Sequence, residues 1–321
     1  FIINEAVETC NLVGRKWSKS LVNAVLRQVA KNFQKLEALY KNHPQWIYSH
    51  PPELLEKIQQ QWPNDWVSIC ESHQHPPCVW INTDFDHSLN KFSSTAHPYI
   101  PNASLLKVKI ENKALNNCYI QDIASQHLKI LLPNEVRSPI LDACSAPGGK
   151  TVILASKYPD HTIVAVDKSC EKIKLIEDNK KRLNLHNVNV FKNNWLKNSL
   201  TNMFGLIIVD TPCSATGTIK RHPEKKRHDI NYAELQETQL KILSSVWELL
   251  IPNGILIYST CSIFSEENDD VIEGFIATHE NASVERCFAD GIGIKRKFGV
   301  QLLPSLVQDG HYFCKLKKST L

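Results

Sequence analysis

From about residue 119 to the end of the chain, short apolar runs alternate with segments of helical pattern. The apolar runs cover residues 139–146, 162–167, 188–191, 205–210 and 254–260. Helical periodicity between them covers residues 151–158, 170–183 and 232–251. Continuous apolar strands that alternate with helices are typical of a parallel sheet buried on both faces. Because crossovers between parallel strands are right-handed, we predict an α/β domain with a doubly wound, mostly parallel sheet.

The first third of the chain has a different pattern. Residues 18–33 place six apolar side chains on one face of a predicted helix: Leu21, Val22, Val25, Leu26, Val29 and Phe33. Prolines at positions 44, 51 and 52 indicate a boundary, and residues 53–62 have the pattern of a short helix. Strand-like runs between residues 78 and 110 indicate a small α/β module. We therefore predict three parts, covering residues 1–43, 44–116 and 117–321.

Composition places the 321 residues among ordinary globular proteins, with 42% hydrophobic and 22% charged residues. No run of about 20 apolar residues occurs, so we expect no membrane-spanning helix. Ten cysteines are scattered from Cys10 to Cys314 without a Cys-x-x-Cys pair. This spacing favours reduced thiols in a cytoplasmic protein and provides no close-spaced metal ligands. We expect a monomer that binds no metal.

The net charge of +4 is concentrated at the amino-terminal end. Residues 1–43 hold seven basic and three acidic residues, and the remainder of the chain balances. Such an excess fits a nucleic-acid partner, and it fits a solvated helical face at least as well.

A Gly-rich turn follows the first strand of the predicted sheet, in the segment ILDACSAPGGKT at residues 140–151. Such a turn presents backbone N–H groups and a helix N-terminus to a ligand. It lacks the first glycine of a P-loop and fits a dinucleotide fingerprint poorly. An S-adenosylmethionine turn and a purely structural turn remain. Asp167 ends the second strand, where an acid can bind ribose hydroxyls. Together these features favour an adenosine cofactor, without separating NAD from S-adenosylmethionine.

Two cysteines lie just past the ends of two later strands. Cys213 follows the strand at 205–210, and Cys261 follows the strand at 254–260. Because parallel strands end at the same edge of a sheet, we expect both thiols at the rim where a ligand binds. Buried cysteine often serves only as a small hydrophobe, but these two positions fit a thiolate nucleophile beside a nucleoside-type cofactor better.

Three of these segments carry a family resemblance. DACSAPGGKT, VDTPCSATGTIKRHPE and YSTCSIFSEEN resemble the motifs of RNA 5-methylcytosine methyltransferases of the RsmB/Sun family. NEAVETCNLVGRKWSKSLVNAVLR resembles the last helices of the NusB-like RNA-binding domain of such proteins, and further similarity covers essentially the whole chain. The resemblance implies a Rossmann-like methyltransferase domain that takes a methyl group from S-adenosylmethionine to carbon 5 of a cytosine in rRNA, in the small subunit.

The resemblance also implies roles for single residues. Cys261 would be the nucleophile that adds to carbon 6, and Cys213 would assist release of the covalent adduct. Asp210 would contact the cytosine ring, and Lys150 would lie near cofactor and base. The cofactor residues by this resemblance are Cys144, Ser145, Ala146, Pro147, Gly148, Gly149, Lys150, Asp167, Asn194 and Asp210. Asn193-Asn194 replaces a Gly-Asp of the family, which is expected to weaken cofactor affinity rather than change the reaction.

A basic loop follows Cys213 and is expected to track RNA phosphates beside the flipped-out cytosine. Its predicted RNA-binding residues are Lys220, Arg221, His222, Lys225 and Lys226. Two other functions stay open. A methyltransferase acting on an exocyclic amine would need no thiol nucleophile. An RNA-binding or ribosome-assembly protein with a weakened enzyme domain would have Asn193-Asn194 as its only support.

Overall fold

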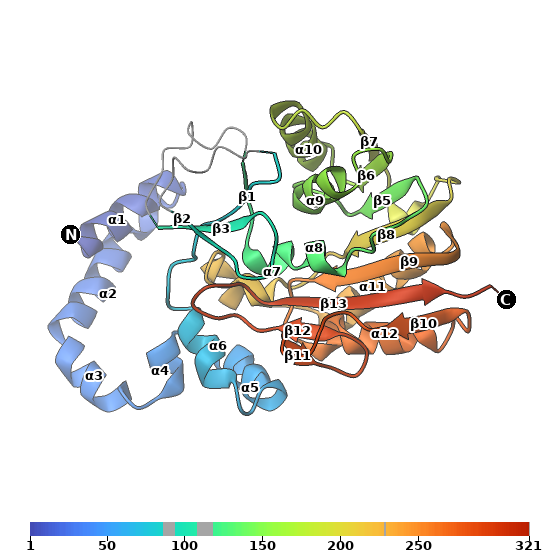
Figure 1. Ribbon diagram of the computed structural model, residues 1–321. Helices are drawn as coiled ribbons and strands as arrows, with labels where there is room; N and C mark the ends of the chain where they lie inside the picture. Colours follow the sequence, from blue (N-terminus) through green and yellow to red (C-terminus); the bar gives the residue numbers. More distant parts are fainter. Residues whose placement is uncertain (86–93, 108–117, 228, 321) are drawn as a thin grey trace. The chain divides into compact units, whose positions relative to one another are not determined.

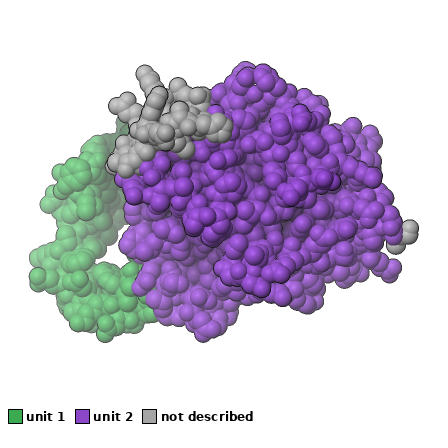
Figure 2. Space-filling view, viewed as in Figure 1, with its two compact units in different colours: residues 1–57 green, residues 58–321 purple. Residues whose placement is uncertain are grey.

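The structure is a computed structural model that describes the chain except residues 86–93, 108–117, 228 and 321. It divides into two compact units, Phe1–Lys57 and Ile58–Leu321 (Figure 2). The boundary predicted after residue 43 falls inside the first unit, and the boundary predicted after residue 116 lies outside the described residues. In the part of the chain that is described, no helix has the length and apolarity that a membrane crossing requires.

The first unit is helical. It contains α1 (Ile2–Leu12), α2 (Lys19–Lys31), α3 (Phe33–Tyr40), α4 (Pro44–Tyr48) and the start of α5 (Pro52–Gln61). The single helix predicted over residues 18–33 is divided between α2 and α3. Its α2 part ends at Lys31, and the backbone N–H and the side-chain amide of Asn32 both donate to the Gln28 carbonyl, at 3.0 and 2.9 Å.

The second unit begins with a small module. After α6 (Trp66–Ser72), four short antiparallel strands form a sheet in the order β2-β3-β1-β4. Their bounds are β1 Trp80–Asn82, β2 Ser94–Ala96, β3 Ala103–Leu106 and β4 Tyr119–Ile120. The predicted strand-like character of residues 78–110 is confirmed where those residues are described.

The main sheet holds nine strands, and its parallel part has the order β9-β8-β5-β6-β7 (Figure 1). These five strands are β5 Ile140–Ala143, β6 Ile163–Asp167, β7 Val188–Lys192, β8 Phe204–Asp210 and β9 Leu250–Thr260. All five predicted strands are confirmed, as is the doubly wound α/β class. The strand order reverses between β5 and β8, and such a switch point opens a ligand crevice at the carboxyl ends.

Helices cover both faces of this sheet (Figure 1). One face packs against α9 (Gly149–Lys157) and α10 (Cys170–Arg182), and the other against α11 (Tyr232–Trp247) and α12 (Asp269–Ile276). Within β8, Leu206 and Ile208 join the first core while Ile207 and Val209 join the second. This alternation explains why the strands are apolar throughout.

The carboxyl-terminal part extends the sheet with antiparallel strands. They are β10 Ala282–Glu285, β11 Ile294–Lys295, β12 Val300–Leu302 and β13 His311–Lys318. β13 pairs with β9, and the register places Tyr312 opposite Thr260. The start of β13 therefore lies beside the segment that leads into Cys261. The helix predicted over residues 232–251 ends earlier, at Trp247, because Leu250 already pairs with Phe204 in the sheet.

Candidate active site

The Gly-rich turn between β5 and α9 is held by hydrogen bonds at the carboxyl edge of the sheet. Both the backbone N–H and the hydroxyl of Ser145 donate to the Val166 carbonyl, at 2.9 and 3.1 Å. Cys144 has φ +59° and Gly148 has φ +109°. The second value is one that only glycine adopts without strain, so the sequence requirement at this position is conformational. The hydrogen bonds fasten the turn to the end of β6.

Asp167 ends β6 and faces this turn. One carboxylate oxygen accepts from the Ala146 N–H at 3.3 Å, and the other accepts from the Ser169 N–H at 2.9 Å. The residue is 8% exposed. Each carboxylate oxygen can accept a further hydrogen bond, so Asp167 can hold a ligand hydroxyl as well as the turn.

Two further features describe the surroundings of this turn. A Cβ atom added to Gly149 would stand 2.9 Å from the Gln121 amide nitrogen, so the lack of a side chain lets Gln121 pack against the start of α9. Asp142, fully buried in β5, donates nothing and accepts one hydrogen bond from Thr151 at 2.6 Å, while its second oxygen has no partner. Burial raises the pKa of Asp142 to about 7, against the opposing hydrogen bond from Thr151. Because Asp142 is 0% exposed, this oxygen lies inside the sheet and not at its surface.

The two asparagines after β7 differ in placement. Asn193 is buried, and its N–H donates to the Asp167 carbonyl at 3.1 Å. Asn194 is exposed, and its side-chain oxygen accepts from the Leu196 N–H at 3.2 Å. Asn194 therefore lies at the same edge as Asp167, with its carboxamide oxygen already used as a helix cap.

Asp210 at the end of β8 and Lys150 in α9 form an ion pair, with 2.6 Å between the ammonium nitrogen and a carboxylate oxygen. The other oxygen accepts from the Ser259 hydroxyl at 3.0 Å. Burial raises the pKa of a carboxyl, but here the charge of Lys150 and the hydrogen bonds from Lys150 and Ser259 outweigh it. The pKa of Asp210 consequently lies below its ordinary value. Since 35% of the side chain stays exposed, the anion remains accessible.

The two cysteines predicted at the rim are in contact. The sulfur atoms of Cys213 and Cys261 are 3.3 Å apart. All ten cysteines lie within the described residues and are free thiols. The hydrogen bond with Cys261, together with burial, raises the pKa of Cys213 well above its ordinary value, so Cys213 stays a thiol. Burial likewise raises the pKa of Cys144, so this thiol is a poor nucleophile.

His311, the first residue of β13, faces the same ion pair. Its ring nitrogen Nε2 is 4.0 Å from a carboxylate oxygen of Asp210 and has no hydrogen-bond partner. Burial, together with the charge of Lys150, lowers the pKa of His311 to about 3, so the ring is neutral at physiological pH. Sequence analysis did not single out this residue, because its contact with Asp210 depends on the pairing of β13 with β9.

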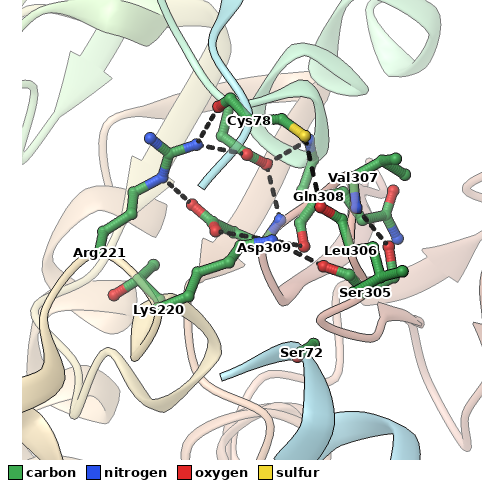
Figure 3. Close-up of polar contacts among 12 residues, drawn as sticks. Ser72, Cys78, Lys220, Arg221, Ser305, Leu306, Val307, Gln308 and Asp309 are labelled. Atoms are coloured by element: carbon green, nitrogen blue, oxygen red, sulfur yellow. Dashed lines mark hydrogen bonds and ion pairs between the residues drawn. The ribbon is translucent and has the colours of Figure 1, made fainter. Parts of the chain in front are cut away.

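The first two residues of the basic loop differ from the expectation that their charges face RNA (Figure 3). Lys220 is 8% exposed, and its ammonium group donates to the carbonyls of Ser305 and Gln308. Arg221 pairs with Asp309 at 2.6 Å and with Asp122 at 2.7 Å. Burial lowers the pKa of an arginine, but the charges of Asp309 and Asp122 outweigh it and raise the pKa of Arg221. Both cations are therefore engaged inside the protein.

The remaining residues of this loop lie farther out. His222 is exposed, with its ring 3.3 Å from a carboxylate oxygen of the equally exposed Glu224. Lys225 and Lys226 are half-buried. Burial lowers the pKa of Lys226, with the Cys70 thiol nearby opposing this effect. Among the described residues, no three His, Cys, Asp or Glu side chains lie close enough together to hold a metal ion.

The site thus holds two pairs at the carboxyl edge of the sheet: the thiols of Cys213 and Cys261, and the ion pair of Asp210 with Lys150. The cofactor turn adjoins the second pair through Lys150. Like His311, Asp142 and Ser259 were not predicted as site residues. Asp142 lies in the motif DACSAPGGKT and Ser259 in YSTCSIFSEEN. Each is a polar residue near the end of an otherwise apolar strand, and that pattern was the available signal. Glu267 of the YSTCSIFSEEN motif is a fourth residue that was not predicted, and its side chain is fully buried.

Comparison with known proteins shows which families the chain is similar to. Residues 128–317 match the family model of the 16S rRNA methyltransferase RsmB/F, and residues 1–31 match that of the NusB family. Ribosomal RNA small subunit methyltransferase B of Klebsiella pneumoniae is 34% identical over 337 residues, covering 98% of this chain and 76% of the relative. The corresponding protein of Cronobacter sakazakii is 32% identical over 338 residues, with the same two coverages.

Among solved structures, a methyltransferase homolog protein from Pyrococcus horikoshii superimposes with a TM-score of 0.72 at 23% identity. The superposition covers 85% of this chain and 97% of that protein, and it shows the shared fold. The turn after β5, the acid that ends β6 and the paired thiols all lie within residues 128–317, the part of the chain that the RsmB/F family model matches. The chain therefore belongs to the RsmB/F family of methyltransferases, with a NusB-like amino-terminal segment and S-adenosylmethionine as its methyl donor.

Proposed function

We propose that this protein methylates carbon 5 of a cytosine in small-subunit rRNA through a covalent bond between Cys261 and the base. The observation that carries the proposal is the pair of thiols 3.3 Å apart, at the carboxyl ends of β8 and β9 and next to the Asp210–Lys150 pair. Names of the relatives support rRNA as the substrate. The choice of carbon 5 and of a covalent route rests on the thiols.

Carbon 5 of cytosine is a weak nucleophile, and a thiolate can activate it. The Cys261 sulfur forms a bond to carbon 6, and the electron pair of the 5,6 double bond moves to carbon 5. S-adenosylmethionine, bound at the Gly-rich turn, supplies an electrophilic methyl group for that carbon. Transfer of the carbon 5 proton to solvent water leaves its electron pair to restore the 5,6 double bond, and the electron pair of the bond between carbon 6 and sulfur departs with the sulfur. Cys261 is thereby regenerated as a thiolate.

The neighbouring side chains support both halves of this sequence. Because Cys213 stays a thiol, its S–H can donate to the Cys261 sulfur as that sulfur takes up charge on leaving. Asp210 stays an anion and can accept a hydrogen bond from an N–H of the cytosine ring, which favours protonation of the ring and so attack at carbon 6. Lys150 holds Asp210 in place through their ion pair.

The two other functions are less well supported. Methylation of an exocyclic amine would leave the contact between two thiols without a purpose. A weakened enzyme that only binds RNA is disfavoured because the turn, Asp167 and both thiols are in place, and Asn193 still ties β7 to Asp167. Bisulfite sequencing of rRNA decides among them: loss of one 5-methylcytosine in a deletion strain, restored by the intact gene, is expected. An unchanged cytosine map would contradict the proposal. A cytoplasmic location and a monomeric state stay predictions.

Replacing Asp167 with alanine is expected to weaken S-adenosylmethionine binding by about 1.5–3 kcal/mol, the worth of hydrogen bonds to a charged group. The change removes acceptors for the ribose and also one anchor of the turn at Ala146. Calorimetry measures the affinity, with Asp160→Ala as the control because Asp160 is an exposed acid in the preceding loop. Unchanged affinity in Asp167→Ala would remove this residue from the cofactor site.

We further propose that the basic loop contacts RNA through His222, Lys225 and Lys226, while Lys220 and Arg221 mainly join loops of the protein. Lys225→Ala is expected to reduce the magnitude of the negative slope of log affinity against log salt by about 0.7–0.9, which corresponds to the loss of one phosphate contact. Lys220→Ala is expected to lower the free energy of unfolding by about 1–3 kcal/mol, because it leaves buried carbonyls without a donor.

These two effects should separate when RNA binding is titrated at several salt concentrations and unfolding is followed in urea. Lys241→Ala is the matched control, since Lys241 is an exposed lysine on α11 whose partner is Glu237. A salt dependence equal to wild type in Lys225→Ala, or a weaker salt dependence with full stability in Lys220→Ala, would reverse the assignment.

A further inference from the structure

A buried carboxylate connects the two cysteine loops. Glu267, the last residue of the short helix η7 (Ser265–Glu267), is 0% exposed. One of its oxygens accepts from the Ser214 N–H at 2.7 Å. The other accepts from the hydroxyls of Ser214 and Ser262. Ser214 directly follows Cys213 and Ser262 directly follows Cys261, so a single side chain holds the residue next to each thiol.

Other contacts close the same connection. Gln239 of α11 donates its amide to the Pro212 carbonyl at 2.9 Å and to Glu267 at 3.3 Å. The Gly217 N–H donates to the Cys261 carbonyl at 2.8 Å. A Cβ atom at Gly217 would lie 2.8 Å from the Cys261 carbonyl oxygen, so a glycine is needed for the two loops to approach this closely. The two loops that carry the thiols are thus joined by a buried network of hydrogen bonds that does not include the thiols themselves.

The chemistry of this network is unusual for a purely structural element. Among the ion pairs of the described residues, none involves Glu267, so hydrogen-bond donors alone satisfy it. A buried carboxylate is expensive to desolvate, and an apolar side chain would fill such a space at lower cost. Its geometric effect, however, is specific, since four donors from two loops and one helix converge on two oxygens.

We propose that Glu267 is a positioning residue that keeps the Cys213 and Cys261 sulfurs in contact, so that both thiols reach the same base. This inference rests on the proposed function for its catalytic part. Its geometric part concerns only the two thiols and can be measured without RNA. Loss of the carboxylate lets the two loops move independently, and a displacement of about 1 Å at a reacting atom costs about a hundredfold in rate.

Glu267→Gln tests this with nearly unchanged volume, and Glu266→Gln is the matched control. Glu266 is in the same helical turn, and its carboxylate accepts from Gln61 at 2.7 Å instead of from either cysteine loop. Two measurements are made on each variant and on wild type. The first is the rate at which diamide, a two-electron thiol oxidant, converts Cys213 and Cys261 to a disulfide, followed by peptide mass spectrometry well below the melting temperature. The second is kcat for RNA methylation, together with the affinity for S-adenosylmethionine.

For Glu267→Gln we expect about tenfold or greater losses in both the disulfide rate and kcat, with cofactor affinity within about twofold of wild type. Glu266→Gln should match wild type in all three. A wild-type disulfide rate in Glu267→Gln would overturn the proposal, whatever happens to kcat. A slow disulfide rate with unchanged kcat would also overturn it, because positioning would then not serve catalysis.

Two results need a second variant or readout. If Glu267→Gln does not fold, Ser262→Ala removes one of the two connections to Glu267 and is measured in the same way. Wild-type values for both quantities in Ser262→Ala would overturn the proposal. If wild type itself makes no 5-methylcytosine, the proposed function fails, while the disulfide rates still decide whether Glu267 holds the thiols together.

Discussion

Cys261→Ala abolishes methyl transfer while leaving the fold intact, with an expected loss in kcat on the order of 10⁴-fold or more, as when a covalent nucleophile is removed. The reason is chemical: without the sulfur, no bond forms at carbon 6, and carbon 5 stays too weak a nucleophile. The thiol lies in a loop just after β9 and is not part of either main core cluster, so alanine there disturbs little packing. Transfer of a radioactive methyl group to RNA measures the loss.

The control for this experiment is Cys170→Ala, which removes an exposed thiol at the start of α10. Cofactor affinity and melting temperature should be the same in Cys261→Ala, Cys170→Ala and wild type. The assignment of Cys261 as nucleophile fails if Cys261→Ala turns over at a rate near that of wild type. Loss of activity accompanied by loss of structure would be assigned to folding, and Cys261→Ser then repeats the measurement with a closer isostere.

Cys213→Ala has a different expected result: attack proceeds and release fails. A complex of protein and RNA should accumulate and survive denaturing gel electrophoresis. The physical basis is the 3.3 Å contact, through which the Cys213 thiol can donate to the Cys261 sulfur as it leaves. Without that donor the bond between carbon 6 and sulfur persists. Multiple turnover should fall steeply, while a first round of methyl transfer can still take place.

The gel also tests the division of roles between the two thiols. The double variant, with both cysteines changed to alanine, should give no adduct, and neither should Cys261→Ala alone. Adduct in Cys261→Ala with none in Cys213→Ala would mean that the two roles are exchanged. Absence of adduct in every variant and in wild type would remove the covalent route from the proposed function.

Much of the architecture follows from pattern alone. Residues 205–209 and 254–258 are almost wholly apolar because both faces of β8 and β9 are covered, and that pattern is visible without a structure. Placing Cys213 and Cys261 at one rim required only that the two strands are parallel neighbours. The antiparallel strands β10 to β13 were not foreseen. β10, β11 and β12 are short, with two to four residues each, and the eight residues of β13 do not alternate between buried and exposed positions.

The basic loop shows where pattern misleads. Lys220 and Arg221 belong to a run of cations that is typical of a phosphate-binding surface, yet both turn inward. Their partner Asp309 lies more than 80 residues away, in the loop before β13. Neither charge periodicity nor composition encodes such a pairing, because it arises only when the loop before β13 folds back over the end of β8.

The sequence by itself therefore determined the five parallel strands and the chemistry-bearing residues at their ends, because these depend on local pattern and on a general rule of parallel sheets. Its motifs also indicated the family. Only the tertiary structure decided which side chains meet. It brought the sulfurs of Cys213 and Cys261 into contact and gave Asp210 its partners Lys150 and Ser259. It also placed Glu267 behind both cysteines. These contacts join segments that are distant in the chain, and their geometry is set by the packing of helices and loops around the sheet.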